Sequence, residues 1–221
     1  MKGILDLEYA HQREKRADLK YRLRRRTDEI LKAIAKFSFH PQKILDLGTA
    51  EGKMLEEIKL KYPSSLCVGT DYSLPLLNYG AKRFSDINFI CADVQNLKFL
   101  RDEIFDVIIA AAIIDHLTIP LEMLRESFRL LKKGGILIIT SPHPFWEKIA
   151  NVFGLIKGDH QSVMSPKEIL TLCENVELSI LDYKGFMISP VGIMGELKIE
   201  QALAKLGLNK FLPNQLMVAR K

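Results

Sequence analysis

The sequence has few cysteines, a single tryptophan and no long apolar run among its 221 residues. Cys67, Cys91 and Cys173 lack the C-x-x-C spacing of zinc and redox motifs, so no metal site is expected. The apolar run Val107–Ile114 is much shorter than the roughly 20 residues that span a bilayer. The N-terminus also lacks the apolar core of a secretory signal. We therefore expect a cytoplasmic chain without a transmembrane segment, in which Cys67 and Cys91 pack inside strands as small apolar side chains.

Positive charge concentrates near the N-terminus, although the formal net charge is only +5. Residues 11–26 hold six arginines and two lysines against Glu14 and Asp18. Two interpretations stay open: the solvated face of a helix, or an arm that binds the phosphates of RNA or anionic lipid. An arm for nucleic acid usually brings aromatic or glycine residues to contact bases, and only Tyr21 is available here. The pattern favours the helix face and leaves nucleic-acid binding as the alternative.

Residues 1–40 are predicted to form an N-terminal helical extension. Apolar residues recur at spacings of three and four from about Leu5 to Phe39, with charged residues between them. Thr27-Asp28-Glu29 could restart a helix, so one bent helix or two shorter ones are expected. His40-Pro41 ends the segment, because the residue before a proline is disfavoured in helical geometry.

Beyond Pro41, short apolar runs alternate with amphipathic stretches. Such alternation predicts right-handed crossovers and a parallel sheet covered on both faces. Gly134-Gly135 is expected to end the helix before the fifth strand, and Ser165 to cap a later helix. The expected strands are Lys43–Leu47, Leu66–Gly69, Ile87–Cys91, Phe105–Ala110, Ile136–Thr140, Val176–Tyr183 and Gln215–Ala219. The expected helices are Lys53–Lys61, Leu74–Phe84, Leu121–Leu131 and Glu196–Leu206.

A glycine turn follows the first expected strand, in the stretch Asp-Leu-Gly-Thr-Ala-Glu-Gly from Asp46 to Gly52. Gly48 and Gly52 let the backbone turn tightly and approach a ligand, and the next helix offers unpaired amides. A plain strand-to-helix connection would look the same. Asp46 narrows the choice, because a carboxylate at the end of a parallel strand suits a cationic ligand and repels a pyrophosphate. A nucleoside triphosphate loop would need Gly-Lys-Ser/Thr, but Met54 follows Gly52-Lys53.

Acids also follow the second and third expected strands. Asp71 comes about twenty residues after the glycine turn, where a carboxylate can accept both hydroxyls of a ribose. A simple turn or cap residue is the alternative, and the glycine turn with Asp46 favours ribose binding. Asp93 repeats the arrangement after Ile87–Cys91. Three strands that each end near an acid indicate one ligand site along the edge of the sheet.

The set of motifs resembles the class I S-adenosylmethionine-dependent methyltransferases, whose first motif is an acid, one residue and then Gly-x-Gly-x-Gly. Alanine replaces the middle glycine here. The resemblance covers roughly residues 40 to 142 and continues through Phe105-Asp106-Val107 and Leu130–Ile139. It implies S-adenosylmethionine as cofactor and S-adenosylhomocysteine as product. It also implies a Rossmann-like α/β fold over residues 41–221, with a seven-stranded, mostly parallel sheet, helices on both faces and an antiparallel final strand. The implied cofactor contacts are Asp46, Gly48, Ala50 and Gly52 for the methionine end, Asp71 and Tyr72 for the ribose, Asp93 and Val94 for the adenine, and Ala111 at the mouth of the site.

Two histidines are candidates for catalysis, since imidazole is the natural base near neutral pH. His116 follows the fourth expected strand in Asp115-His116-Leu117, which resembles a Glu-His-Leu motif of small-molecule members of the family. A structural role near the cofactor is the favoured interpretation of His116. His143 lies between prolines before Phe145 and Trp146, which predicts either a pocket wall or a rigid packed loop.

The expected substrate is a small or lipid-like methyl acceptor, with oxygen ahead of carbon or nitrogen. This follows from an apolar stretch at Phe186–Met194 and from an amphipathic pattern over Trp146–Ile156, which predicts a lid helix, a peripheral membrane contact or an ordinary core helix. Three alternatives stay open. The first is an RNA methyltransferase that uses Arg22–Arg26. The second is a non-catalytic partner protein, which stays possible because Ala50 replaces the middle glycine of the motif. The third is an oxidoreductase, which the absence of a Tyr-x-x-x-Lys pair disfavours.

Overall fold

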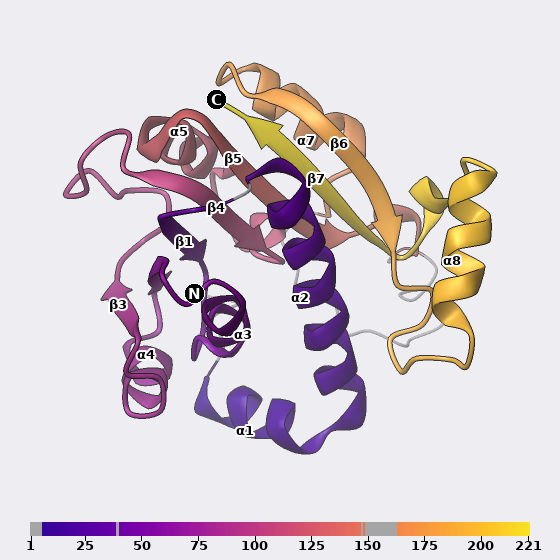
Figure 1. The fold of residues 1–221 in the computed structure, drawn as a ribbon, viewed down its shortest axis with the longest axis horizontal. Helices are drawn as coiled ribbons and strands as arrows, with labels where there is room; N and C mark the ends of the chain where they lie inside the picture. The colour runs from indigo at the N-terminus through magenta and orange to yellow at the C-terminus, as the bar shows by residue number, and fades with distance from the viewer. Residues whose placement is uncertain (1–5, 39, 147, 149–162) are drawn as a thin grey trace.

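The computed structural model describes residues 6–38, 40–146, 148 and 163–221. A seven-stranded sheet in the order β3-β2-β1-β4-β5-β7-β6 forms the centre of the molecule, and helices cover both of its faces (Figure 1). The strands are β1 (Lys43–Leu47), β2 (Leu66–Asp71), β3 (Ile87–Cys91), β4 (Phe105–Ala111), β5 (Leu131–Pro142), β6 (Ser179–Phe186) and β7 (Asn214–Arg220). The helices are α1 (Leu7–Lys15), α2 (Ala17–Phe37), α3 (Lys53–Lys61), α4 (Leu74–Ala81), α5 (Pro120–Leu130), α7 (Pro166–Glu174) and α8 (Glu196–Lys205), with short turns η1 (Ile114–His116) and η2 (Asn209–Phe211).

The direction of the strands confirms the predicted Rossmann-like architecture. Strands β1 to β5 pair in parallel, and β7 runs antiparallel to both β5 and β6. The carboxyl ends of β1 to β6 therefore meet at one edge of the sheet, which is where ligands bind in folds of this kind. We call it the ligand edge.

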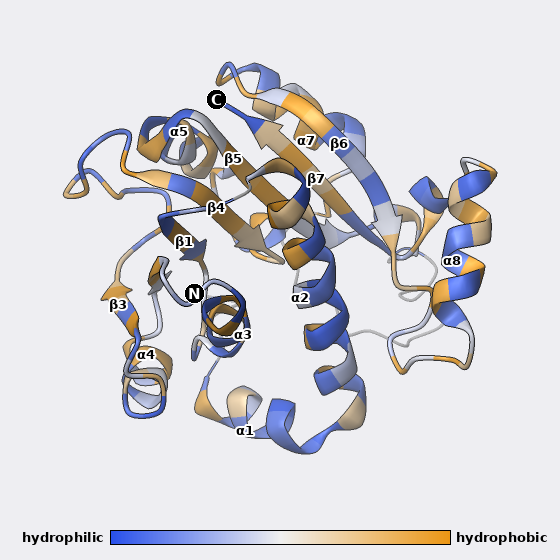
Figure 2. Ribbon diagram, in the orientation of Figure 1, coloured by the Kyte–Doolittle hydropathy of each residue, from blue (hydrophilic) through white to orange (hydrophobic). Residues whose placement is uncertain are grey.

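Alternation along the buried strands builds two apolar layers. In β4, Ile108 and Ala110 belong to the layer that α5 and α7 cover, whereas Val107 and Ile109 belong to the layer under α2 and α3. Successive side chains of a strand point to opposite faces, so a strand covered on both sides is apolar throughout. Figure 2 shows this as orange strands between helices of mixed colour.

The N-terminal extension is two helices, but they part at Arg16 and not at Thr27-Asp28-Glu29. Arg16 takes an extended conformation (φ −82°, ψ 124°) between α1 and α2. Thr27 lies inside α2, where its hydroxyl donates to the Leu23 carbonyl, 2.9 Å away. Ile30 and Ile34 of α2 are fully buried against the sheet.

The prediction that Gly134-Gly135 ends the helix before the fifth strand is wrong. Helix α5 ends at Leu130, and Leu131 is already extended and pairs with Phe105 of β4. The glycines instead lie in an irregular part of β5, where the amide of Gly134 (φ +79°) donates to the Lys221 carbonyl at 2.9 Å. Ser165 caps α7 as predicted, in a reciprocal capping box with Glu168.

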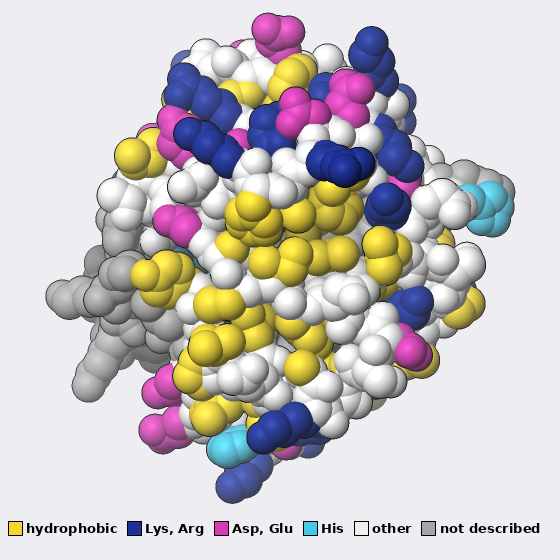
Figure 3. Space-filling view, turned by 90° about the vertical axis from the view of Figure 1, so that its left-hand side faces the viewer, with side chains coloured by type: hydrophobic (Ala, Val, Ile, Leu, Met, Phe, Trp, Pro, Cys, Tyr) yellow, Lys and Arg dark blue, Asp and Glu magenta, His cyan; other side chains and the backbone are white. Residues whose placement is uncertain are grey.

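Strand β3 forms one edge of the sheet. Cys67 is buried in β2 as expected, but Cys91, in β3, is exposed, so its prediction is wrong. An edge strand lacks a neighbour on one side, and its last residue reaches solvent. Figure 3 views the molecule from this side, where apolar side chains gather in the middle of the face with lysines and arginines above and below.

Candidate functional site

The turn after β1 adopts the predicted tight conformation. Gly48 and Ala50 both have positive φ, +72° and +52°, and Gly52 (φ +82°) precedes α3. The amides of Gly48 and Thr49 donate to the Thr70 carbonyl at 2.8 and 3.0 Å, which fixes the turn against β2. Alanine at position 50 thus keeps the left-handed backbone of a glycine, and its methyl group packs in a small apolar cluster with Ala10 and Leu76.

Two glycines are required here by close approach. A Cβ at Gly48 would lie 2.4 Å from Cδ1 of Ile113, in the connection after β4. A Cβ at Gly80 would lie 2.3 Å from the carbonyl oxygen of Glu51, because α4 packs directly on the turn. The sequence indicated the importance of Gly48 but not of Gly80. Glycine is required at position 80 because α4 packs against the glycine turn, and the sequence does not show that contact.

Asp46, at the end of β1, is a carboxylate with no solvent exposure. None of the residues that the structure describes gives its oxygens a well-formed hydrogen bond. Burial raises its pKa to about 7; the Thr49 hydroxyl lowers the pKa, the nearby Asp71 carboxylate raises it and Arg13 lowers it. A buried carboxylate that lacks partners is costly to ionise and suits a cation that arrives with a ligand.

Asp71 acts as a turn residue, which is one of the two roles that the sequence left open. Its Oδ2 accepts a hydrogen bond from the Ala50 amide and its Oδ1 one from the Ser73 amide, each at 2.8 Å. The carboxylate is therefore a turn residue that is also locked in place beside the glycine turn. Because a carboxylate offers about four acceptor sites, it can still accept two hydroxyls of a ribose.

The remaining predicted cofactor residues line the same edge. The Ala92 amide donates to the Asp71 carbonyl at 3.0 Å, so the acid after β3 follows directly beside the acid after β2. Asp93 is exposed and accepts from the Gln95 amide at 2.9 Å, while Val94 packs into the core. Tyr72 is about half exposed. Ala111 ends β4, next to β1 in the sheet.

Helix α1 lies across the glycine turn, which the sequence did not reveal. Arg13 forms an ion pair with Glu51 at 3.2 Å, and its guanidinium lies 4.9 Å from the centre of the Tyr9 ring. Arg26 of α2 is half-buried and has no carboxylate partner among the residues that the structure describes. Burial, with repulsion from Arg22 and Arg13, lowers the pKa of Arg26 to about 10. Arg26 therefore lies near Arg13, the residue that pairs with Glu51 of the glycine turn.

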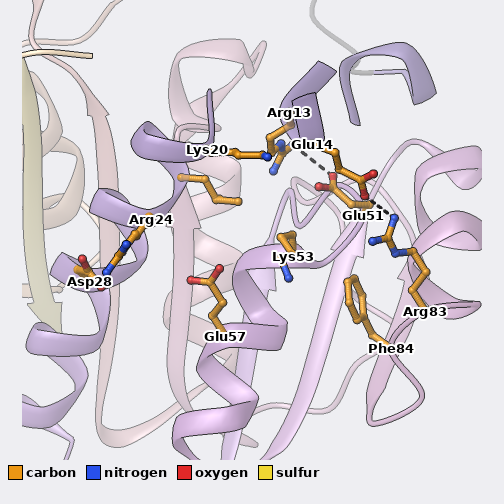
Figure 4. Close-up of a pocket in the computed structure, with 11 residues that line it drawn as sticks. Arg13, Glu14, Lys20, Arg24, Asp28, Glu51, Lys53, Glu57, Arg83 and Phe84 are labelled. Atoms are coloured by element: carbon orange, nitrogen blue, oxygen red, sulfur yellow. Dashed lines mark hydrogen bonds and ion pairs between the residues drawn. The ribbon is translucent and has the colours of Figure 1, made fainter. Parts of the chain in front are cut away.

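A cavity of about 480 Å³ lies behind this contact, between α1, α2 and α3. Figure 4 shows the Arg13–Glu51 and Glu14–Arg83 pairs at its rim. Five basic and four acidic side chains line it, so its charge is nearly balanced and does not suit a polyanion. Arg25, part of the basic stretch, is buried in ion pairs with Glu29 and Glu200.

The two candidate histidines occupy different places on the ligand edge. His116 lies in η1, directly after β4. Its neighbour Asp115 is buried and accepts from the Met164 amide at 3.1 Å, which fixes the approach to α7. His143 follows β5, two strands from β1, and its amide donates to the Pro213 carbonyl at 2.8 Å. Apart from Trp146, the apolar residues of the expected lid helix lie outside the described residues, as does Asp159-His160.

Comparisons with known proteins agree with this geometry. A family model described as a methyltransferase domain matches residues 45–139. A demethylmenaquinone methyltransferase from Thermotoga maritima is 30% identical over an alignment of 166 residues, which covers 68% of this chain and 72% of that protein. The chain is a class I S-adenosylmethionine-dependent methyltransferase.

This methyltransferase is also similar to a second relative and to a solved structure. A ubiquinone biosynthesis O-methyltransferase from Ruegeria sp. is 27% identical over 163 residues, 67% of this chain and 65% of that protein. The crystal structure of an S-adenosylmethionine-dependent methyltransferase from Archaeoglobus fulgidus shares 17% identity with a TM-score of 0.66, over 98% of this chain and 100% of that one. At that identity the second similarity supports the fold.

The residues of the site fit the family's cofactor, S-adenosylmethionine. Asp46 is a buried carboxylate whose oxygens have no well-formed hydrogen bond from the described residues, which suits the ammonium of a methionine group. The described residues contain no cluster of side chains that could hold a metal ion. They also include no helix of the length and apolar character that a membrane span requires.

Proposed function

We propose that this methyltransferase transfers a methyl group to an oxygen atom of a small or lipid-like acceptor. The observation that carries the proposal is a set of exposed apolar residues in the segments that follow β5 and β6, at the edge of the sheet where β1 to β4 also end: Phe145, Trp146, Val191, Ile193 and Met194. The name of one relative refers to demethylmenaquinone and that of another to O-methylation in ubiquinone biosynthesis. Both names refer to a quinone, and the second also names oxygen as the acceptor atom.

The proposal also assigns the contacts of the cofactor. Asp46 would bind the ammonium of the methionine group, and Arg26, assisted by Arg13, would bind its carboxylate. Asp71 would accept the ribose hydroxyls, with Tyr72 beside the ribose, while Asp93 and Val94 would contact the adenine. Gly48, Ala50 and Gly52 would bring the backbone close to the cofactor, and Ala111 would line the mouth of the site.

The bound cofactor supplies a methyl group on a sulfonium, and the protein supplies position and a dry surrounding. Direct displacement needs the acceptor atom in line with the methyl group and water excluded. A hydroxyl acceptor also gains from a base that removes its proton. The chain's own contribution is therefore to orient the acceptor and to hold the histidines beside it.

His143 fits a donor better than a base. Burial lowers the pKa of His143, which favours the neutral ring. Its Nδ1 accepts a hydrogen bond from the Phe145 amide at 3.3 Å, which favours the tautomer with the proton on Nε2. In that form Nε2 donates to an oxygen of the acceptor and orients it. His116, directly after β4, is then the candidate base.

Methyl transfer to a short-chain hydroxyquinone probe tests the proposal, with labelled S-adenosylmethionine and with tRNA as a competing acceptor. We expect label in the quinone. We expect His116→Gln to lower kcat by about 100-fold or more, His143→Gln to raise KM mainly, and both variants to bind S-adenosylhomocysteine normally. Label in RNA, or none in any oxygen acceptor from a protein that binds the cofactor, would contradict the proposal.

A further inference from the structure

Helix α8 buries an acidic side chain and exposes apolar ones. Its only buried residue is Glu196, while Leu197 and Ile199 are 52% and 45% exposed. The turn before it continues this pattern, with Val191 at 65% and Met194 completely exposed. A helix of a soluble protein normally turns its apolar stripe inward and its charges outward. Here the buried residue is an acid, and apolar side chains of the helix and of the turn before it are exposed.

The two acids of α8 are held inward by specific contacts. Glu200 binds the Arg25 guanidinium and the Met187 amide, each at 2.7 Å. Glu196 binds the Tyr21 hydroxyl and accepts from the Ile188 amide at 2.7 Å. These contacts attach α8 to α2 and to the end of β6, so the outward direction of the apolar residues is built into the fold.

The outward side therefore combines apolar and positive groups. We define the α8 surface as Val191, Ile193, Met194, Leu197 and Ile199, all of which are exposed. The lysines of this part of the chain, Lys198, Lys205 and Lys210, are exposed as well. Because both acids are turned inward, the exposed part of α8 and of the turn before it carries apolar and positive side chains.

An aromatic group continues the α8 surface toward the ligand edge. Trp146 is 41% exposed, and its indole nitrogen donates to the Phe211 carbonyl at 2.6 Å, next to α8. Phe145, which packs edge-on against Trp146, is 57% exposed. A tryptophan with a bonded nitrogen and an exposed ring is typical of residues at the boundary between water and lipid.

We propose that the α8 surface docks this protein on a membrane that contains anionic lipids. The apolar side chains would enter the boundary between headgroups and acyl chains, and the lysines would bind the headgroups. A second copy of the chain is a poorer occupant, because a symmetric contact would bring the lysines of the two copies together. Since β6 ends at the ligand edge, docking would place that edge close to the lipid. The supply of a lipid-like acceptor by this route rests on the proposed function, whereas the docking itself does not.

Vesicle co-sedimentation of the full chain tests the docking. The probes are phosphatidylcholine vesicles with and without phosphatidylglycerol. We expect binding that requires the anionic lipid, and a shift of the Trp146 emission to shorter wavelength on binding; Trp146 is the only tryptophan and reports directly. Replacing Val191 and Met194 by aspartate should weaken binding by at least about tenfold, and each lysine changed to glutamate by about fivefold or more.

The control is Leu60→Asp, which introduces the same charge at a 74%-exposed leucine of α3, away from α8. This variant should bind vesicles like the wild type, and every variant should bind S-adenosylhomocysteine normally, which separates the docking from the cofactor site. Wild type that does not sediment with anionic vesicles would overturn the proposal. Equal losses in the Leu60 variant, or a dimer that the Val191 and Met194 changes dissociate, would also overturn it.

Discussion

Replacing Asp46 by asparagine is expected to stabilise the ligand-free protein at alkaline pH and to weaken cofactor binding at the same time. Asp46 is fully buried, and none of the described residues forms a well-made hydrogen bond to its oxygens. Ionising it in the folded protein is therefore unfavourable, whereas in the unfolded chain it ionises freely. Asparagine has nearly the same shape and no charge to bury.

The size of the effect follows from the pKa. Burial raises the pKa of Asp46 from 3.8 to about 7, and each unit corresponds to 1.36 kcal/mol. The folded state binds the proton more tightly, so the stability is complete below about pH 4 and falls as the pH rises through 7. Relative to its stability below pH 4, the free energy of unfolding of the wild type falls by about 4 kcal/mol at pH 8 but by less than about 2 kcal/mol at pH 5. The advantage of the asparagine variant should thus grow by about 2 to 3 kcal/mol between these pH values.

Urea unfolding at pH 5 and pH 8 measures the difference in the free energy of unfolding between the two proteins. Calorimetric titration of S-adenosylhomocysteine measures the loss of affinity in the variant. Wild-type affinity should rise about tenfold from pH 6 to pH 8 as Asp46 ionises, and the variant should lose that dependence. Asp106→Asn is the matched control, because Asp106 already binds two backbone amides and Lys132. That variant should be less stable than the wild type at both pH values. An Asp46 variant with equal stability effects at pH 5 and pH 8 would refute the reasoning.

Two further predictions concern the packing around the site. Gly80→Ala should lower the free energy of unfolding by more than about 2 kcal/mol and weaken cofactor binding, because its Cβ would meet the Glu51 carbonyl oxygen at 2.3 Å; a normal melting curve would show that α4 can move away. Arg25→Leu should cost about 3 to 5 kcal/mol, since Glu200 would stay buried without its cation. Urea titration would contradict this if the loss were below about 1 kcal/mol.

The order of elements and the ligand edge could be predicted because local patterns determine them. Runs such as Lys43–Leu47 are buried on both faces, so they read as continuous apolar strands. The acids at 46, 71 and 93 follow strands that are neighbours in a parallel sheet, and this brings them together without further information. The methyltransferase family was then recognisable because these acids and the glycine turn resemble its motifs.

Contacts between distant segments could not be predicted in the same way. The requirement for glycine at Gly80 depends on how α4 meets the turn after β1, and the role of Arg13 depends on where α1 crosses it. The end of α5 at Leu130 follows from the pairing of Leu131 with β4, which outweighed the glycines four residues later. The acids of α8 are turned inward because Arg25 and Tyr21 lie opposite them.

The most direct test of the cofactor site is calorimetric titration of S-adenosylhomocysteine into the wild type and an Asp71→Asn variant, with NADH as a control ligand. Asparagine keeps one acceptor for the amides of the glycine turn but loses the charge that favours two hydroxyls. The account predicts saturable binding by the wild type, about tenfold or more weaker binding by the variant, and no binding of NADH. Failure of a folded wild type to bind S-adenosylhomocysteine, or equal affinities in the two proteins, would contradict the assignment of the strand-end carboxylates.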